Sequence, residues 1–305
     1  LHAKIRQIAS LEFGLSPDRV KVNATNTSKI PNTSPTAAST GSDINGMAVK
    51  NAIDNLKSKL VALAVQEFTL RSPERMISNE NILFERNRVV DKENPLLSIS
   101  FKELCRLAHL NRVSLSSTGF YKTPGLFFDR ESGQGNPFYY YSYGAAVSEV
   151  MIDTLTGRHR LLRTDILHDA GDSINPAADR GQIEGAFIQG LGWCTTEEIK
   201  WDSHGRLLTH SPDTYKIPVI SDIPKDFRVD LLSGVPNPGT IRGSKAVGEP
   251  PFMLALSAWL AIRDAISASG DYRKDFGFTL PATAESILLF IEQNREIFNF
   301  KIAKP

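Results

Sequence analysis

Apolar residues recur at helical spacing in several stretches of the chain. The first predicted helix covers residues 1–13, and Gly14 supplies its stop signal. A further helix begins at Asn175-Pro176, because proline fits the first turn, where its missing N–H is not needed. The same periodicity predicts other helices over residues 45–64, 101–110, about 250–268 and 282–294.

Between residues 137 and 166 the pattern changes to aromatic and β-branched residues, which is typical of strands. Two long strands are predicted on either side of the turn Asp153–Gly157, which ends in glycine as hairpin turns often do. Shorter strands are predicted at Val20–Asn23, within Ile82–Val90, at Arg206–Thr209 and at Phe227–Leu232. Hairpins beside packed helices predict an α+β fold with mixed or antiparallel sheets.

Residues 67–97 are charged and only weakly periodic, and we interpret them as a peripheral insertion. The chain opens inside a helix, with no N-terminal punctuation and no initiator methionine. We therefore expect residues 1–305 to be one part of a larger unit, truncated on its N-terminal side.

The composition excludes several classes of protein. A net charge of +1, with acids and bases mixed, gives no electrostatic reason to expect nucleic acid as a partner. The longest apolar run, Phe252–Ile262, is shorter than the roughly 20 residues that span a bilayer, so no membrane partner is expected. The chain has 2 cysteines, too few for a disulfide scaffold or a four-cysteine metal site. A cytoplasmic location is the simplest expectation.

The most informative stretch is Gly243–Pro251, in which Glu249 stands between Gly248 and two prolines. Gly248 permits close approach, whereas Pro250 and Pro251 fix the backbone and remove two N–H donors. Such a carboxylate would be held in place and partly dehydrated, as a general base requires. The structural alternative is an acid at the start of a helix, where the helix dipole favours it.

A second candidate is the loop of residues 31–42, which is rich in Ser, Thr, Pro and Ala and precedes the helix predicted over 45–64. Its small residues and hydroxyl groups suit a phosphate or a polar ring system close to a helix N-terminus. The alternative is a solvated linker whose helix is capped by Ser42 or Asp43.

A third candidate is the stretch Gly181–Gly192. Gly181 and Gly185 lie one helical turn apart on the same face, and Gln182 offers both a donor and an acceptor. Small residues on a helix allow close approach by a cofactor or, equally, by another helix.

Common catalytic motifs are absent from the sequence: it has no P-loop, no His-Glu-x-x-His and no Gly-x-Ser-x-Gly elbow. His168, Asp169 and Asp172 lie close together in sequence. A lone histidine beside acids is more often a structural residue than a ligand, so we predict no protein-ligated metal site.

Taken together, these stretches resemble the molybdenum-cofactor-binding portion of the xanthine oxidase family of molybdenum hydroxylases. The resemblance covers nearly the whole chain and is weakest over residues 67–97. It rests on four ordered segments, Pro31–Ser39, Leu115–Pro124, Gly181–Gly190 and Ser244–Pro251. It implies that the fold is the C-terminal part of that molybdenum-binding domain.

The resemblance also implies roles for individual residues. Glu249 matches the family's catalytic base, which acts while water-derived oxygen is inserted at a substrate carbon and hydride passes to Mo=S. Ala38 and Ser39 match the loop that touches molybdopterin, and Gln182 matches a glutamine that hydrogen-bonds the cofactor. Lys245 matches a position that supports the glutamate loop.

The implied cofactors and partners extend beyond the chain. Molybdenum-molybdopterin would bind here together with an upstream part of the molybdenum domain. Two [2Fe–2S] clusters and FAD would lie on a partner chain or segment, because 2 cysteines cannot hold the clusters. The family resemblance further implies a homo-oligomeric complex.

The form Ala246–Pro251 is similar to that of the xanthine dehydrogenases, whereas aldehyde oxidases tend toward a Gly-Leu-Gly-Glu-Ser loop. This favours a purine substrate, with urate formed from hypoxanthine and xanthine. The family's substrate-orienting residues lie upstream of the matched segments. An aldehyde oxidase-type hydroxylase therefore stays open as an alternative, as does a catalytically silent cofactor-binding or assembly module.

Overall fold

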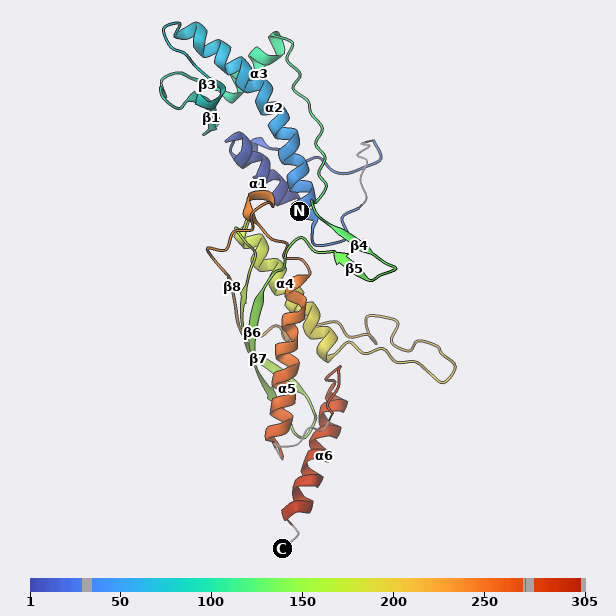
Figure 1. Cartoon of the computed structure of the whole chain (residues 1–305). Coiled ribbons are helices and arrows are strands. Elements are labelled where there is room, and N and C mark those ends of the chain that lie inside the picture. The colour runs from blue at the N-terminus through green and yellow to red at the C-terminus, as the bar shows by residue number, and fades with distance from the viewer. Residues whose placement is uncertain (29–34, 271, 273–276, 303–305) are drawn as a thin grey trace. The chain divides into compact units, whose positions relative to one another are not determined.

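The computed structural model describes the backbone of residues 1–28, 35–270, 272 and 277–302. The chain divides into two compact units (Figure 1). Unit 1 comprises Leu1–Tyr141, Asp172–Asn175 and Pro236–Ala246. Unit 2 comprises Ser142–Gly171, Pro176–Val235 and Val247–Pro305.

Unit 1 combines helices with small antiparallel sheets. Its α-helices are α1 (His2–Phe13), α2 (Gly41–Arg71) and α3 (Phe101–Leu110), and its short 3₁₀ helices are η1 (Pro17–Arg19), η2 (Asn79–Asn81) and η4 (Ile241–Gly243). The strands β1 (Ile82–Glu85), β2 (Arg88–Asp91) and β3 (Ser98–Ser100) form one antiparallel sheet. The strands β4 (Phe127–Asp129) and β5 (Gln134–Asn136) form a separate hairpin.

The largest core of unit 1 lies where α2 and α3 meet the β1–β3 sheet. Phe68 on α2 and Leu104 on α3 are fully buried there, and Val89 of β2 packs with them. Residues 67–97 thus supply part of this core, although their polar composition gives only a weak helical or strand pattern. Whether they form an insertion relative to similar proteins stays a prediction.

Unit 2 is built on a mixed sheet. Strand β6 (Gly144–Ile152) pairs antiparallel with β7 (His159–His168), and β8 (Asp226–Leu231) pairs parallel with β7. Parallel neighbours need a crossover connection, and α4 (Pro176–Thr195) provides it. The remaining helices are η3 (Ile220–Asp222), η5 (Pro250–Ala255), α5 (Leu256–Ala268) and α6 (Ala284–Ile302).

Helices α4 and α5 cover the same face of this sheet. Phe187 of α4 is fully buried, and its ring centroid lies 5.5 Å from that of Phe227 on β8. The hydroxyls of Ser148 on β6 and Ser257 on α5 are 2.8 Å apart. The opposite face leaves Val147 and Leu167 exposed, so burial alternates along the strands as expected for a half-covered sheet.

The α+β prediction is confirmed. The hairpin around Asp153–Gly157 and the helix over residues 101–110 occur as predicted, and the helix expected from residue 45 begins earlier, at Gly41. The predicted strand Val20–Asn23 is wrong, because this segment follows η1 without regular pairing. Arg206–Thr209 forms one isolated bridge, between Trp201 and Leu207, instead of a strand.

The segment Pro250–Ala268, which joins η5 to α5, is long and apolar enough to cross a membrane by length and composition alone. The apolar run Phe252–Ile262, which contains Ser257, is shorter than this segment. Ala258, Ile262 and Ile266 of α5 are fully buried in the cores of unit 2. These buried residues account for the apolar composition of one face of the helix.

Candidate functional site

The described part of the Ser/Thr-rich loop leads directly into α2 in unit 1. Pro31–Ser34 lie outside the described residues, Ala38 is exposed and Ser39 is half-buried. A Cβ built on Gly41 would lie 2.6 Å from the methyl carbon of Thr36, so the loop packs closely on the helix start. Ala38 and Ser39 are therefore presented beside a helix N-terminus.

The N-terminus of α2 is not capped in the way expected if residues 31–42 were only a solvated linker. Thr40 is the N-cap residue, and no side-chain cap hydrogen bond is formed within the described residues. Ser42 and Asp43 lie inside the first turn, so the prediction that one of them caps the helix is wrong. Because the first N–H groups of a helix have no partner within the helix, the start of this 31-residue helix favours an anion.

Asp43 is used in a buried network instead. The hydroxyl of Tyr140 donates a hydrogen bond to Oδ2 of Asp43 and accepts one, 2.8 Å long, from the backbone N–H of Ala246. Burial raises the pKa of the Asp43 carboxyl, an effect opposed by the Tyr140 hydrogen bond and the Lys4 charge. No sequence motif marks Tyr140, since its partners are distant in the chain.

The segment that precedes Glu249 is held by its own hydrogen bonds in unit 1. The hydroxyl of Thr240 donates to the carbonyl of Ser244 at 2.7 Å, and the Ser244 hydroxyl donates to the carbonyl of Ile241 at 2.8 Å. Lys245 Nζ donates to the Tyr141 carbonyl at 2.9 Å. Lys245 thus links the segment that leads to Glu249 to the Tyr141 backbone, and its supporting role at the glutamate loop stays a prediction.

Glu249 itself is the N-cap residue of η5 in unit 2. Its backbone carbonyl accepts from Phe252 N at 3.0 Å, and its side chain forms no cap hydrogen bond with the helix. Pro250 and Pro251 cannot donate to it, since proline has no N–H. The predicted partial dehydration is not observed, because Glu249 is exposed in this chain. Local prolines restrict the backbone but do not cover a side chain.

Helix α4 presents an open face at its N-terminal half. A Cβ built on Gly181 or Gly185 would meet no atom within 4 Å, and Gln182 on this part of the helix is exposed. At Gly190 the same construction places the Cβ 2.5 Å from the carbonyl oxygen of Phe252. Close packing therefore explains Gly190 but not Gly181 or Gly185.

The predicted residues fall into two sets. Ala38, Ser39 and Lys245 belong to unit 1, whereas Gln182 and Glu249 belong to unit 2. Within unit 2, Gln182 lies near the start of α4, and η5, which Glu249 begins, packs against the same helix at Gly190. Each set by itself offers groups that suit a polar, phosphorylated ligand.

A cavity of about 770 Å³ lies beside the loop in unit 1. Pro35 and Thr36 of the loop line it together with Asn45 of α2, whose side-chain amide donates to the Gly41 carbonyl at 2.8 Å. The other lining residues come mainly from α1 and α2 and are mostly apolar or small. The cavity gives the loop a concave neighbour of the size that small-molecule sites have.

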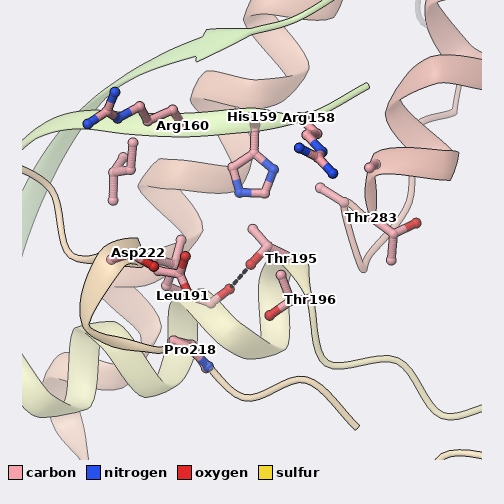
Figure 2. Close-up of a pocket in the computed structure, with 13 residues that line it drawn as sticks. Arg158, His159, Arg160, Leu191, Thr195, Thr196, Pro218, Asp222 and Thr283 are labelled. Carbon is pink, nitrogen blue, oxygen red and sulfur yellow. Dashed lines mark hydrogen bonds between the residues drawn. The ribbon is translucent and has the colours of Figure 1, made fainter. Parts of the chain in front are cut away.

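A second cavity, of about 490 Å³, lies within unit 2 (Figure 2). Figure 2 shows the His159 ring pointing toward Thr195 and Asp222, with Arg158 beside it. The cavity reaches α4 at Leu191, which is about 14 Å along the helix from Gln182 at 1.5 Å per residue. None of the predicted site residues lines it, so it is separate from the candidate site.

Burial lowers the pKa of His159, and the Asp222 charge opposes this shift only in part. His159 therefore binds a proton less readily in folded unit 2 than in the unfolded chain, where a histidine is protonated below a pH of about 6.5. We expect stability to fall as the pH drops from about 6.5 toward the folded-state pKa, and His159→Gln to remove that part of the loss. Urea unfolding followed by tryptophan fluorescence measures it, because Trp193, Trp201 and Trp259 all lie in unit 2. An unchanged pH slope in His159→Gln, relative to the exposed control His204→Gln, contradicts the assignment.

Among the residues described here, no group of three or more His, Cys, Asp or Glu side chains could hold a metal ion. The chain's own donors instead suit an organic cofactor that carries its metal with it. The Ser39 hydroxyl, the α2 N-terminus and the Gln182 amide can bind phosphate and ring heteroatoms. The open space over Gly181 and Gly185 leaves room for a ring system. These residues fit molybdopterin.

Solved structures of similar fold include an oxidoreductase and a dehydrogenase. The chain matches quinoline 2-oxidoreductase from Pseudomonas putida 86 with a TM-score of 0.80 and 24% identity, over 96% of this chain and 35% of that one. It matches a Cu,Mo-CO dehydrogenase with a TM-score of 0.79 and 22% identity, over 95% and 34% of the two chains. These likenesses establish the fold.

Two relatives have a higher sequence identity to the chain than these solved structures have. The chain is 44% identical over 293 residues to the xanthine dehydrogenase/oxidase of Felis catus, covering 94% of this chain and 20% of that protein. It is 43% identical over 293 residues to the xanthine dehydrogenase of Dictyostelium discoideum, covering 94% and 19%. The chain thus spans about a fifth of the length of these relatives.

Residues 1–224 match the family model of the molybdopterin cofactor-binding domain. The matched range includes Ala38, Ser39 and Gln182, while Glu249 lies beyond it. Fold, relatives and family model agree with the resemblance inferred from the four sequence segments. The chain therefore belongs to the family of molybdopterin cofactor-binding domains.

Proposed function

We propose that the chain forms part of a molybdenum hydroxylase that oxidises hypoxanthine and xanthine to urate. The observation that carries this proposal is the open face of α4, where Gln182 is exposed beside Gly181 and Gly185. A packing role does not explain these glycines, whereas a bound cofactor does. The purine substrate is supported by relatives named xanthine dehydrogenase at 43–44% identity.

When bound, the molybdenum cofactor supplies the two-electron oxidation by which water-derived oxygen is inserted at a substrate carbon. Ser39 and Ala38 hold the cofactor from the loop before α2, and the Gln182 amide orients it by hydrogen bonding. Glu249 acts as the base, since its carboxylate accepts the proton released as oxygen bonds to carbon. In the complete enzyme, surfaces beyond this chain cover the exposed Glu249 and exclude water around it.

The remaining components of the proposal lie outside residues 1–305. Iron–sulfur and FAD segments carry electrons away from the site, and an upstream part of the molybdenum domain completes the pocket and orients the purine. We further propose that the complex is a homo-oligomer and works in the cytoplasm.

The test uses the complete enzyme, purified with its cofactors. We expect urate to form from xanthine, with a kcat/KM for xanthine at least 10-fold above that for benzaldehyde. Preferential oxidation of benzaldehyde would favour the aldehyde oxidase alternative instead. Molybdenum and pterin bound stoichiometrically to residues 1–305 alone, without turnover, would favour the silent module.

A further inference from the structure

Two segments important to the proposed site meet at a single hydroxyl group in unit 1. Tyr140 donates to Asp43 Oδ2 on α2 and accepts the backbone N–H of Ala246 at 2.8 Å. Asp43 is 7% exposed and Ala246 is 5% exposed, so water does not compete freely for these bonds. Neither Tyr140 nor Asp43 belongs to any of the four segments that carry the family resemblance.

The two partners of Tyr140 adjoin the proposed functional residues in sequence. Asp43 lies four positions after Ser39, in the first turn of α2. Ala246 lies three positions before Glu249, with only Val247 and Gly248 between them. Because an extended chain spans at most about 3.3–3.6 Å per residue, fixing Ala246 keeps the Glu249 backbone within about 10 Å of that anchor.

The direction of the two hydrogen bonds is fixed by protonation. Burial raises the pKa of the Tyr140 hydroxyl, and the neighbouring Asp43 carboxylate raises it further, so the phenol keeps its proton. The O–H must then point to the carboxylate, and the phenolic oxygen is left to accept the amide of Ala246. A hydrogen bond to an ionised acceptor is shorter and stronger than a neutral one.

Removal of this hydroxyl takes one partner from Asp43 and one from Ala246. Oδ1 of Asp43 is buried without a hydrogen-bond partner in the described part of the chain, so Oδ2 carries the interaction of this carboxylate with Tyr140. A phenylalanine at position 140 would also remove the hydrogen bond from the Ala246 N–H to the phenolic oxygen. The backbone before Glu249 would then lose this hydrogen-bonded link to α2 and keep the packing of Ile241 on Met47 and Val49.

We propose that Tyr140 is a positioning residue, whose hydroxyl ties the start of α2 to the segment that leads into Glu249 and so limits where the backbone of the base can lie. This inference rests on the proposed function of Glu249. Tyr140 acts on the chemistry through the backbone of Ala246 and needs no contact with substrate or cofactor.

The test compares Tyr140→Phe with Tyr139→Phe in the complete enzyme. Tyr139 is the matched control, because its ring stacks edge-on against Tyr140 and its hydroxyl has no hydrogen-bond partner among the described residues. Rapid mixing with xanthine under anaerobic conditions measures the limiting rate of enzyme reduction and the substrate Kd separately. For Tyr140→Phe we expect the limiting rate to fall about 10–100-fold, since small misplacement of a catalytic group has effects of this size. Kd, molybdenum content and pterin content should change less than 2-fold, and Tyr139→Phe should match the wild type.

Asp43→Asn provides a second, milder variant should Tyr140→Phe fail to accumulate. Its amide oxygen can still accept from Tyr140 but carries no charge, so we expect a smaller fall in the limiting rate with Kd unchanged. A wild-type limiting rate in both variants, or a loss of activity that only follows lost molybdenum, overturns the positioning role.

The outcomes separate this inference from the proposed function. If the wild-type enzyme oxidises benzaldehyde and not xanthine, the purine proposal fails, and the same comparison with benzaldehyde still decides the role of Tyr140. If Glu249→Ala abolishes turnover while Tyr140→Phe retains it fully, the base assignment stands and the positioning role is overturned.

Discussion

Replacing Glu249 with alanine in the complete enzyme is expected to slow xanthine oxidation by about 10²–10⁴-fold, the usual contribution of a general base. Molybdenum and pterin should stay bound, because Glu249 is exposed and the proposal assigns the holding of the cofactor to Ala38, Ser39 and Gln182. The prolines that follow it keep the backbone in place whichever side chain it carries. Initial rates of urate formation, with molybdenum measured on the same sample, check this expectation.

Two further variants make the result specific to the carboxylate. Glu249→Gln preserves the shape and hydrogen-bonding groups of the side chain but cannot accept a proton at neutral pH, so its loss should approach that of alanine. Glu80→Ala removes an exposed glutamate in unit 1 and should leave the rate unchanged. Turnover of Glu249→Ala within a few-fold of the wild type would eliminate Glu249 as the base.

Features governed by local periodicity were predictable from the sequence. The helix over residues 101–110 has one apolar face and a serine cap, and the structure reproduces its bounds as α3. The hairpin after β6 turns at Gly157, whose φ of 69° is readily adopted only by glycine. By contrast, the sequence predicts one strand within Ile82–Val90, whereas the structure has β1 and most of β2 there. Arg86 and Asn87 adopt positive φ and reverse the chain without a glycine signal.

Features set by contacts distant in sequence were not predictable from it. Tyr140 lies 97 positions from Asp43 and 106 from Ala246, and only an aromatic run marks its place in the chain. The prediction that Glu249 is partly dehydrated in this chain is wrong for a related reason. The Gly-Glu-Pro-Pro sequence correctly predicts a restricted backbone. The burial of the Glu249 side chain depends on which other segments lie over it, and no local motif encodes that.

A glycine on α4 can be explained by cofactor binding or by helix packing. The two explanations predict opposite effects of a leucine at Gly185 and at Gly190 on stability and on cofactor content. Leucine at Gly185 enters open space and replaces a poor helix former with a good one, so unit 2 should be as stable as before or gain up to about 1 kcal/mol. Cofactor should nevertheless be lost, because the side chain fills the face on which we place it. Molybdenum and pterin per enzyme are expected to fall at least 10-fold.

Leucine at Gly190 should have the reverse effect, since its Cβ would lie 2.5 Å from the Phe252 carbonyl oxygen and 2.7 Å from the Ala255 Cβ. Both atoms belong to η5, which cannot shift without disturbing the core of unit 2. Overpacking of this kind costs about 1–3 kcal/mol, measurable as a lower urea midpoint by tryptophan fluorescence. A stable Gly185→Leu enzyme that retains full cofactor would show that the open face serves something else, and an unperturbed Gly190→Leu would show that η5 is not packed against α4. Because the two sites share one helix, the contrast between them separates cofactor binding from packing without relying on either variant alone.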